Sequence, residues 1–116
     1  MGVYYKAKLS GSTEGAPIAV SAVNSTGANT IHTCSTSTGA NIWDEVYLWA
    51  HSQDTDVDLT IEYGSTSAIL KQRLNYNEGM VQVLPGTIGN GALVIKAFKG
   101  STGASVFITG FVNQIR

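Results

Sequence analysis

The sequence predicts a small all-β protein, folded as a single antiparallel β-sandwich of about seven strands with an extended N-terminal arm. The segment from Asp56 to Tyr63, DVDLTIEY, alternates strictly between polar and apolar residues, which is typical of a strand with one buried face. Similar stretches recur at intervals of about 12 residues, as in sandwiches and barrels, and turn residues separate them. No convincing helical pattern interrupts them. A jelly roll or a barrel is the alternative arrangement.

The composition indicates one domain that makes contacts with other proteins. The chain has 116 residues, of which 43% are hydrophobic and only 13% are charged, against about 25% charged in a typical domain. Ser, Thr, Asn and Gly must therefore cover much of the surface, and such a surface suits burial against protein. The formal net charge is −1 and no basic stripe is present, so we expect no nucleic-acid partner.

No apolar run approaches the roughly 20 residues of a membrane helix, so we expect no membrane partner. The N-terminus, MGVYYKAKLSGS, lacks the apolar core of a signal peptide, which favours synthesis in a cytoplasm.

Residues 1–28 are predicted to form an extended N-terminal arm, and residues 29–116 the β-sandwich body. The arm combines an apolar start, a flexible stretch (SGSTEGAP) and a second short extended piece, so it would contain one or two short strands. Arms of this type often stay mobile until they dock on a partner. The candidate docking residues are Val3, Tyr4, Tyr5, Leu9, Pro17, Ile18 and Val20.

Turn residues divide the body into seven predicted strands, at residues 30–34, 43–51, 56–63, 68–74, 80–84, 92–99 and 105–115. The strand at 43–51 is largely apolar on both faces, so it must lie between two layers or between a sheet and a neighbouring subunit. The strands at 43–51 and 56–63 are predicted to form an antiparallel hairpin. The Pro85-Gly86 turn signal is expected to end the strand at 80–84.

Aromatic side chains are the strongest candidates for a binding surface. Tyr47, Trp49 and His51 alternate along one strand and therefore share a face. The candidate self-association residues are Tyr47, Trp49, His51 and Phe98. Exposed aromatic residues also form carbohydrate-binding platforms, whereas core and subunit packing use the same residue types, so both interpretations stay open.

No arrangement in the sequence is typical of a catalyst or of a metal site. Cys34 is the single cysteine, and a buried structural thiol is favoured although His32 would share its face in a strand. Asp54, Asp56 and Asp58 suggest a calcium site, but the Gly and the distal Glu of an EF-hand loop are missing. We therefore predict no catalytic residues, no metal and no cofactor.

A histidine and a pair of neighbouring carboxylates are also weak candidates for catalysis. His51 closes an apolar strand, where a structural histidine is the favoured interpretation. Asp44 and Glu45 are neighbours in a strand, so their carboxylates point to opposite faces and cannot easily act together as acid and base.

Residues 28–116 contain, in order, the segments ANTIHT, WDEVYLWA, DVDLTIEYG, VQVLPG, GALVIKAF and ITGFVNQI. This pattern resembles a family of small structural proteins of tailed bacteriophages. The resemblance implies a virion protein of the capsid decoration or cement type, placed on the head surface as a homotrimer. It implies the major capsid protein and further copies of the chain as partners. The arm, residues 1–28, departs from the shared pattern.

In this interpretation, the arms would add strands to the edges of capsid sheets by β-augmentation, and three linked arms would bind with avidity. Two alternatives stay open. One is a tail, fibre or adaptor component of the virion that binds host-surface carbohydrate through exposed aromatic residues. The other is a small β enzyme.

Overall fold

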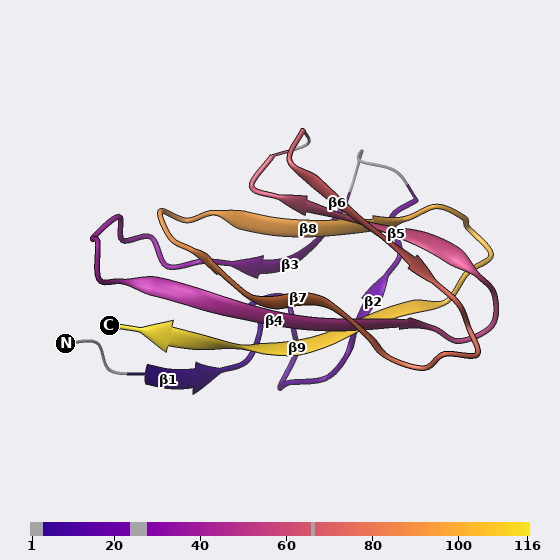
Figure 1. Cartoon of the computed structure of the whole chain (residues 1–116), viewed down its shortest axis with the longest axis horizontal. Helices are drawn as coiled ribbons and strands as arrows, with labels where there is room; N and C mark the ends of the chain where they lie inside the picture. The colour runs from indigo at the N-terminus through magenta and orange to yellow at the C-terminus, as the bar shows by residue number, and fades with distance from the viewer. Residues whose placement is uncertain (1–3, 24–27, 66) are drawn as a thin grey trace.

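The computed structural model describes residues 4–23, 28–65 and 67–116, and these residues form two antiparallel β-sheets packed face to face (Figure 1). This arrangement confirms the predicted all-β sandwich. Within the described ranges there is no helix, and hence none long and apolar enough to cross a membrane.

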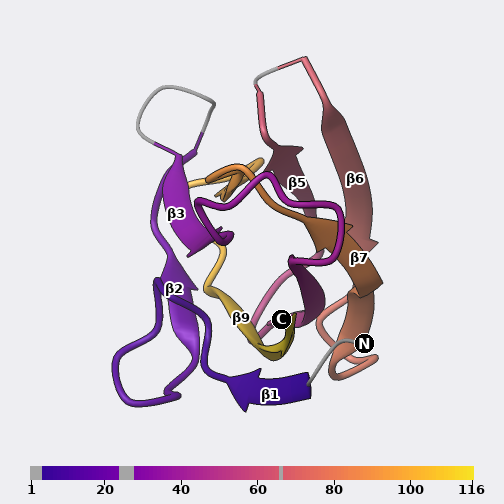
Figure 2. The same ribbon diagram turned by 90° about the vertical axis from the view of Figure 1, so that its left-hand side faces the viewer.

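The described residues form the strands β1 (Tyr4–Ala7), β2 (Ile18–Val20), β3 (Asn29–Thr33), β4 (Trp43–Ser52), β5 (Val57–Tyr63), β6 (Ile69–Leu74), β7 (Val81–Gly89), β8 (Val94–Lys99) and β9 (Val106–Ile115). The first sheet has the order β1-β9-β4-β7, and β2 also pairs with β9. The second sheet has the order β3-β8-β5-β6. Figure 2 shows β6 and β7 on one side of the sandwich and β2 and β3 on the other.

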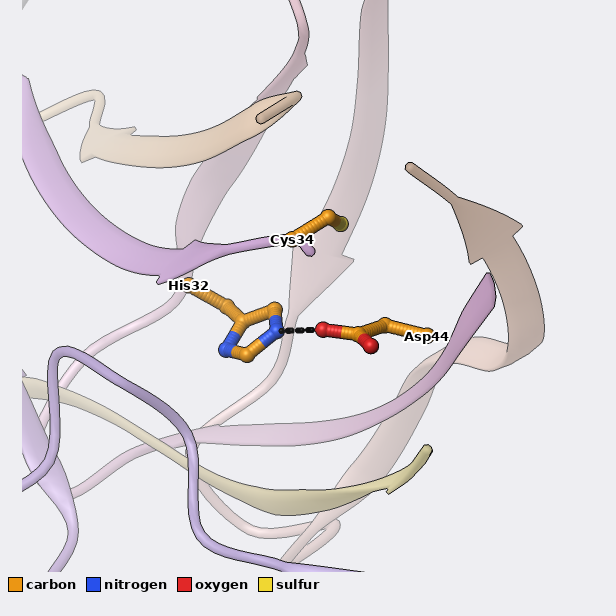
Figure 3. A group of neighbouring side chains, drawn as sticks. All are labelled: His32, Cys34 and Asp44. Atoms are coloured by element: carbon orange, nitrogen blue, oxygen red, sulfur yellow. Dashed lines mark hydrogen bonds and ion pairs between the residues drawn. The ribbon is translucent and has the colours of Figure 1, made fainter. Parts of the chain in front are cut away.

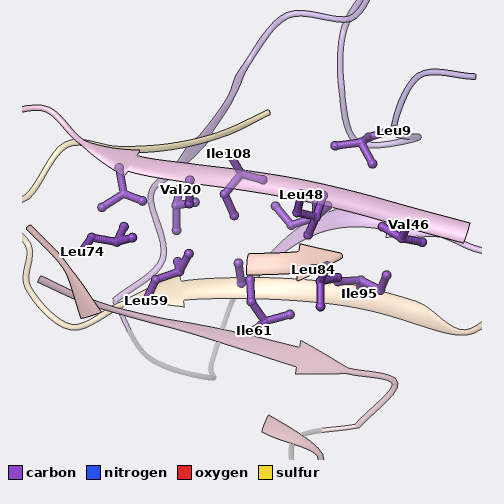
Figure 4. Close-up of a cluster of buried hydrophobic side chains, with 14 of the residues drawn as sticks. Leu9, Val20, Val46, Leu48, Leu59, Ile61, Leu74, Leu84, Ile95 and Ile108 are labelled. Atoms are coloured by element: carbon purple, nitrogen blue, oxygen red, sulfur yellow. The ribbon is translucent and has the colours of Figure 1, made fainter. Parts of the chain in front are cut away.

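The core lies between the two sheets, where the inward residues of each strand meet (Figure 4). Alternation along β4 turns Val46, Leu48 and Ala50 inward, and all three are fully buried. Leu59 and Ile61 of β5 face them from the other sheet. Full burial of such a side chain stabilises the fold by roughly 1.5–3 kcal/mol.

The N-terminal segment that the sequence suggested as an arm is built into the first sheet over its described part. β1 pairs with residues 112–115 of β9, and β2 pairs with residues 106–108 of the same strand. Because β4 occupies only one edge of β9, the two short strands complete the other edge. Leu9 and Val20 lie in the core at 1% and 2% exposure. The expectation that these two residues are free for docking is therefore wrong.

The predicted hairpin between the strands at 43–51 and 56–63 is also wrong. β4 pairs with β7 and β9, whereas β5 pairs with β6 and β8 in the other sheet. The turn after Ser52 therefore carries the chain from one sheet to the other. Both strands have an apolar inner face, and the crossing lets these faces bury each other instead of lying side by side.

Pro85-Gly86 does not end its strand, since β7 continues to Gly89. The pairing of β4 with β7 shifts register twice near this point, so the dipeptide is accommodated as an irregularity of an edge strand. Gly86 has φ +98°, and a Cβ at this position would lie 2.9 Å from the Tyr47 ring. Glycine is therefore required both by the backbone conformation and by the close contact.

The polar face of β5 is only partly exposed, in contrast to the prediction. Thr60 and Glu62 are 4% and 3% exposed. In the register of the sheet, Glu62 lies between Ile69 and Lys96 on the neighbouring strands. Because β5 is an interior strand, side chains of β6 and β8 flank its polar face on both sides and cover it.

We predict that the N-terminal segment contributes to folding stability. Leu9→Ala should lower the free energy of unfolding by about 2–4 kcal/mol, because it leaves a cavity in the core. Tyr5→Ala is the matched control, since Tyr5 is 55% exposed on the same segment. Chemical denaturation measures both changes, and equal small losses would show that the segment lies outside the folded unit.

Candidate functional site

The outer face of the first sheet carries a cluster of aromatic side chains, which we call the aromatic face. It consists of Tyr47, Trp49 and His51 on β4 and Phe107 and Phe111 on β9, all half-buried. The second sheet packs against the opposite side of these strands, and no other described strand covers the aromatic face. The predicted common face of Tyr47, Trp49 and His51 is thus found on the outside of the sandwich.

The rings of the aromatic face stack on one another nearly in parallel. Tyr47 and Phe111 have centroids 4.9 Å apart with an interplanar angle of 17°. Trp49 lies 6.1 Å from Phe111, and His51 lies 5.9 Å from Phe107. Aromatic pairs of this kind contribute about 0.5–1.5 kcal/mol beyond their buried area.

A row of contacts continues from this cluster across the first sheet. Lys6 Nζ of β1 lies 4.4 Å from the Phe111 centroid, a cation–π geometry. Since β1 and β4 flank β9 on opposite sides, Lys6 and Tyr47 approach Phe111 from opposite directions. Gly86 of β7 borders Tyr47 on its far side. Phe111 therefore has Tyr47 and Lys6 against its ring, and Tyr47 has Phe111 and Gly86.

This geometry weighs against a carbohydrate platform at Phe111 and Tyr47, because sugar stacking requires an open ring face. It suits a protein partner, since aromatic residues are enriched at the centres of protein interfaces.

Phe98 does not belong to this surface. It lies on β8 in the second sheet, opposite Thr60 of β5. The predicted self-association set is therefore divided between the two outer faces of the sandwich, because alternation within a strand does not reveal which sheet the strand joins. Sequence reasoning missed Phe107 and Phe111 as partners, although alternation in VFITGFVNQI places both on one face.

The candidate docking residues of the N-terminal segment are also divided. Tyr4 and Tyr5 are 65% and 55% exposed on β1, and Pro17 is exposed. Ile18 is half-buried, whereas Leu9 and Val20 belong to the core. Val3 lies outside the described residues. The accessible part of the predicted docking set is therefore mainly the β1 tyrosines.

The described residues bring three potential metal ligands together at one place, His32, Cys34 and Asp44 (Figure 3). Their ligand atoms lie within 4.8 Å of one another, and all three side chains are buried. His32 Nε2 is 2.9 Å from Asp44 Oδ2, which joins β3 of the second sheet to β4 of the first. Arg116 Nη1 lies 3.4 Å from the other carboxylate oxygen.

The hydrogen bonds of His32 define its tautomer. The backbone N–H of Ser10 donates to Nδ1 at 3.0 Å, so Nδ1 carries no proton. Nε2 must then carry the proton and donate to Asp44. A metal bound at Nε2 would displace this proton to Nδ1, where it would face the Ser10 N–H. The cluster therefore fits a structural hydrogen-bonded pair better than a metal site.

Cys34 is a buried thiol, as the sequence predicted, with 3% exposure. Burial, and then the nearby Asp44 carboxylate, raise the pKa of the thiol to about 11. The thiol therefore keeps its proton near neutral pH and is a poor nucleophile. With both nitrogens of the His32 ring engaged, no free base lies beside it.

The carboxylates of the acidic run Asp54, Asp56, Asp58 are not among the described potential ligands that lie close together, and each has its own partner. Asp54 accepts from the Ser105 backbone N–H at 3.2 Å, and Asp56 accepts from the Tyr76 N–H at 3.1 Å. Asp58 pairs with Arg73 at 3.1 Å. Asp44 is buried and Glu45 is half-buried, so these neighbours point to opposite faces as predicted.

Comparison of the chain with protein-family models, with curated proteins and with solved structures found no match. The fold itself is a two-sheet antiparallel β-sandwich with an aromatic outer face on the first sheet.

We predict that the Cys34 thiol makes stability depend on alkaline pH. Its pKa is about 11 in the folded chain against an ordinary 9.0, so the unfolded state loses its proton first. Stability from this group is complete below pH 9 and is lost as the pH rises towards 11. Cys34→Ala should abolish this part of the decline.

The free energies of unfolding of the wild type and Cys34→Ala at pH 8 and pH 10.5 check this prediction. Burial, and then Cys34, also raise the pKa of Tyr63, to about 12. The burial effect on Tyr63 is present in both proteins and largely cancels in the comparison. Identical pH profiles for the two proteins would contradict the prediction.

Proposed function

We propose that the protein is a structural virion component, a capsid decoration or cement protein that binds and stabilises a phage head as a homotrimer. The resemblance of residues 28–116 to small structural proteins of tailed bacteriophages supports this class. The observation that carries the proposal is the aromatic face, which is uncovered on an otherwise well-packed sandwich. A cement protein needs a rigid body and adhesive surfaces, and it needs no catalyst.

The aromatic face is the proposed contact between copies. The molecule measures 45 × 26 × 21 Å, so its broad side is large enough for a standard interface of about 800 Å² per partner. Outward residues of β4 and β9 would form the centre of this contact. Few charges interrupt this part of the sheet, which favours burial in a subunit interface.

The proposed contact with the major capsid protein lies at β1, where Tyr4 and Tyr5 are exposed at the end of the first sheet. A contact made by one copy would be weak, but three copies joined in a trimer would bind with avidity. Binding to the assembled head and not to free capsid subunits would stabilise the shell by mass action.

The alternative functions have less support. A tail, fibre or adaptor component that binds host-surface carbohydrate would use open ring faces, and the rings of Phe111 and Tyr47 have neighbours against them. A β enzyme would use the His32, Cys34 and Asp44 group. There the thiol is protonated and both ring nitrogens of the histidine are engaged.

We predict that Trp49→Ala weakens self-association at least tenfold while the monomer stays folded, because tryptophan is enriched among interface hot spots, whose truncation costs about 2 kcal/mol or more. Phe98→Ala is the matched control, since Phe98 is a half-buried aromatic residue on the opposite outer face. Sedimentation over a range of concentrations measures both variants. Equal effects of the two substitutions, or a monomeric wild type, would argue against the aromatic face as the contact.

The virion assignment predicts that the protein purifies with phage heads at a copy number comparable to that of the major capsid protein. Heads that lack the protein should gain thermal stability when the purified chain is added back.

A Tyr4→Ala, Tyr5→Ala double variant should bind heads less tightly but keep its oligomeric state. A much lower copy number, restricted to tails, would favour the fibre or adaptor alternative.

A further inference from the structure

Several exposed apolar side chains lie on β6, on β7 and in the connection between these two strands. Ile69 and Leu70 of β6 are 44% and 46% exposed. Tyr76 and Met80, in the connection to β7, and Ile88 of β7 are also exposed. β6 and β7 are the end strands of their sheets on one side of the sandwich (Figure 2).

The backbone of β6 has one open edge. β6 pairs with β5 and with no other described strand. The Tyr63 N–H donates to Ala68 O, and antiparallel alternation then directs the backbone groups of Leu70, Gln72 and Leu74 towards β5. Those of Ile69, Lys71 and Arg73 point away from the sheet. The Arg73 carbonyl accordingly accepts from its neighbour's side chain, Gln72 Nε2, at 3.0 Å.

The other sheet edges are better protected. At β3, the Gly11 N–H donates to Ile31 O, and Ser10 Oγ accepts from the Thr33 N–H. At β7, Pro85 lacks a donor, and Ile88 O accepts from the Tyr63 hydroxyl at 2.9 Å. β1 and β2 are short, which itself limits pairing with another strand.

An apolar pocket lies beside the open edge. Its volume is about 400 Å³, and it is lined by Tyr63, Ser67, Ala68, Ile69, Leu70 and Thr87. The pocket lies between β6 and β7, so a strand added to β6 would direct alternate side chains towards it.

The charge on β6 indicates what kind of strand fits. Lys71 and Arg73 alternate with Gln72 and point to the outer face of the sheet. Arg73 pairs with Asp58, whereas Lys71 lies opposite Thr60 and forms no ion pair with a described residue. A partner residue opposite Lys71 would gain most from being acidic.

A second copy fits this edge poorly. Two β6 strands meeting edge to edge would bring Lys71 and Arg73 of each copy into one short ladder, where like charges repel. The exposed strand β1 carries Lys6 and leads to Lys8, so it also lacks acidic residues. Neither β6 nor β1 of a second copy is therefore a suitable occupant of this edge, which points to a different protein.

We propose that the open edge of β6 binds an extended segment of another protein, with apolar residues opposite Ile69 and Leu70 and an acidic residue opposite Lys71. The segment would pair antiparallel with β6 and place one apolar side chain in the adjacent pocket. This interaction surface is separate from the aromatic face and from β1, and it does not depend on the proposed virion role.

The test uses the full chain and two synthetic peptides. The acidic probe contains Thr-Val-Glu-Val-Ile, which sets Glu opposite Lys71 in antiparallel register, and the basic probe has Lys in place of Glu. Binding should protect the amide protons of Ile69, Lys71 and Arg73 from solvent exchange in NMR spectra. The acidic probe should bind about two- to tenfold more tightly than the basic one, as expected for one cross-strand charge pair.

Lys71→Glu should reverse this preference. Lys96→Glu is the matched control, because Lys96 is exposed on the same outer face but on the interior strand β8. Leu70→Asp should abolish binding of both probes, and thermal unfolding verifies that each variant is folded.

Three results would overturn the proposal. The first is that no amide of β6 gains protection, and the second is that both probes bind equally. The third is that the amides are already protected by self-association without a probe, because the occupant would then be a second copy.

Discussion

The pairing of β4 with β9 is the constraint on which the rest of the structure depends. The two strands stay in register over ten residues, from Trp43 opposite Ile115 to Ser52 opposite Val106. A side chain at Gly110 would put its Cβ 2.0 Å from the Tyr47 carbonyl oxygen, so the close approach requires glycine. Inward residues of this ladder build the core, and outward residues build the aromatic face. Stability and surface chemistry therefore come from the same two strands.

Polar contacts then fasten the sheets to one another. The buried bond between His32 and Asp44 connects the second sheet to the first, and Ser10 and Arg116 complete its hydrogen bonding. Removal of one partner from such a buried hydrogen bond typically costs about 1–3 kcal/mol, because the other buried polar group is left unsatisfied. A group of residues that resembles a catalytic or metal site by composition is thus explained by its part in joining the layers.

Local pattern was sufficient to predict the strands and their faces, but not which strands pair. Alternation identified the inner residues of β4 and β5 and the common face of Tyr47 and Trp49. It could not show that β4 and β5 join different sheets, because a short turn is compatible with a hairpin and with a crossing. For the same reason, the sequence placed Phe98 in one set with aromatic residues that lie on the other sheet.

The N-terminal segment illustrates a second limit. Its short apolar pieces look like those of a docking arm, because both kinds of segment are extended and both use Gly-rich connections. What distinguishes them is whether β9 has a free edge, and this depends on pairing between residues about 100 positions apart, as between Tyr4 and Ile115. The open edge of β6 could not be predicted for the same reason, because a strand is known to lie at an edge only when its pairing partners are known.

We propose that this sandwich acts by adhesion through the outer side of β4 and β9. Paramagnetic relaxation by a soluble probe, measured by NMR on the ring protons of Tyr47, Trp49 and Phe111 at low and high protein concentration, tests it most directly. If the aromatic face is the contact between copies, these rings become shielded as concentration rises, while Phe98 on the other sheet stays equally accessible. Rings that remain fully accessible in a protein that stays monomeric at every concentration would contradict it.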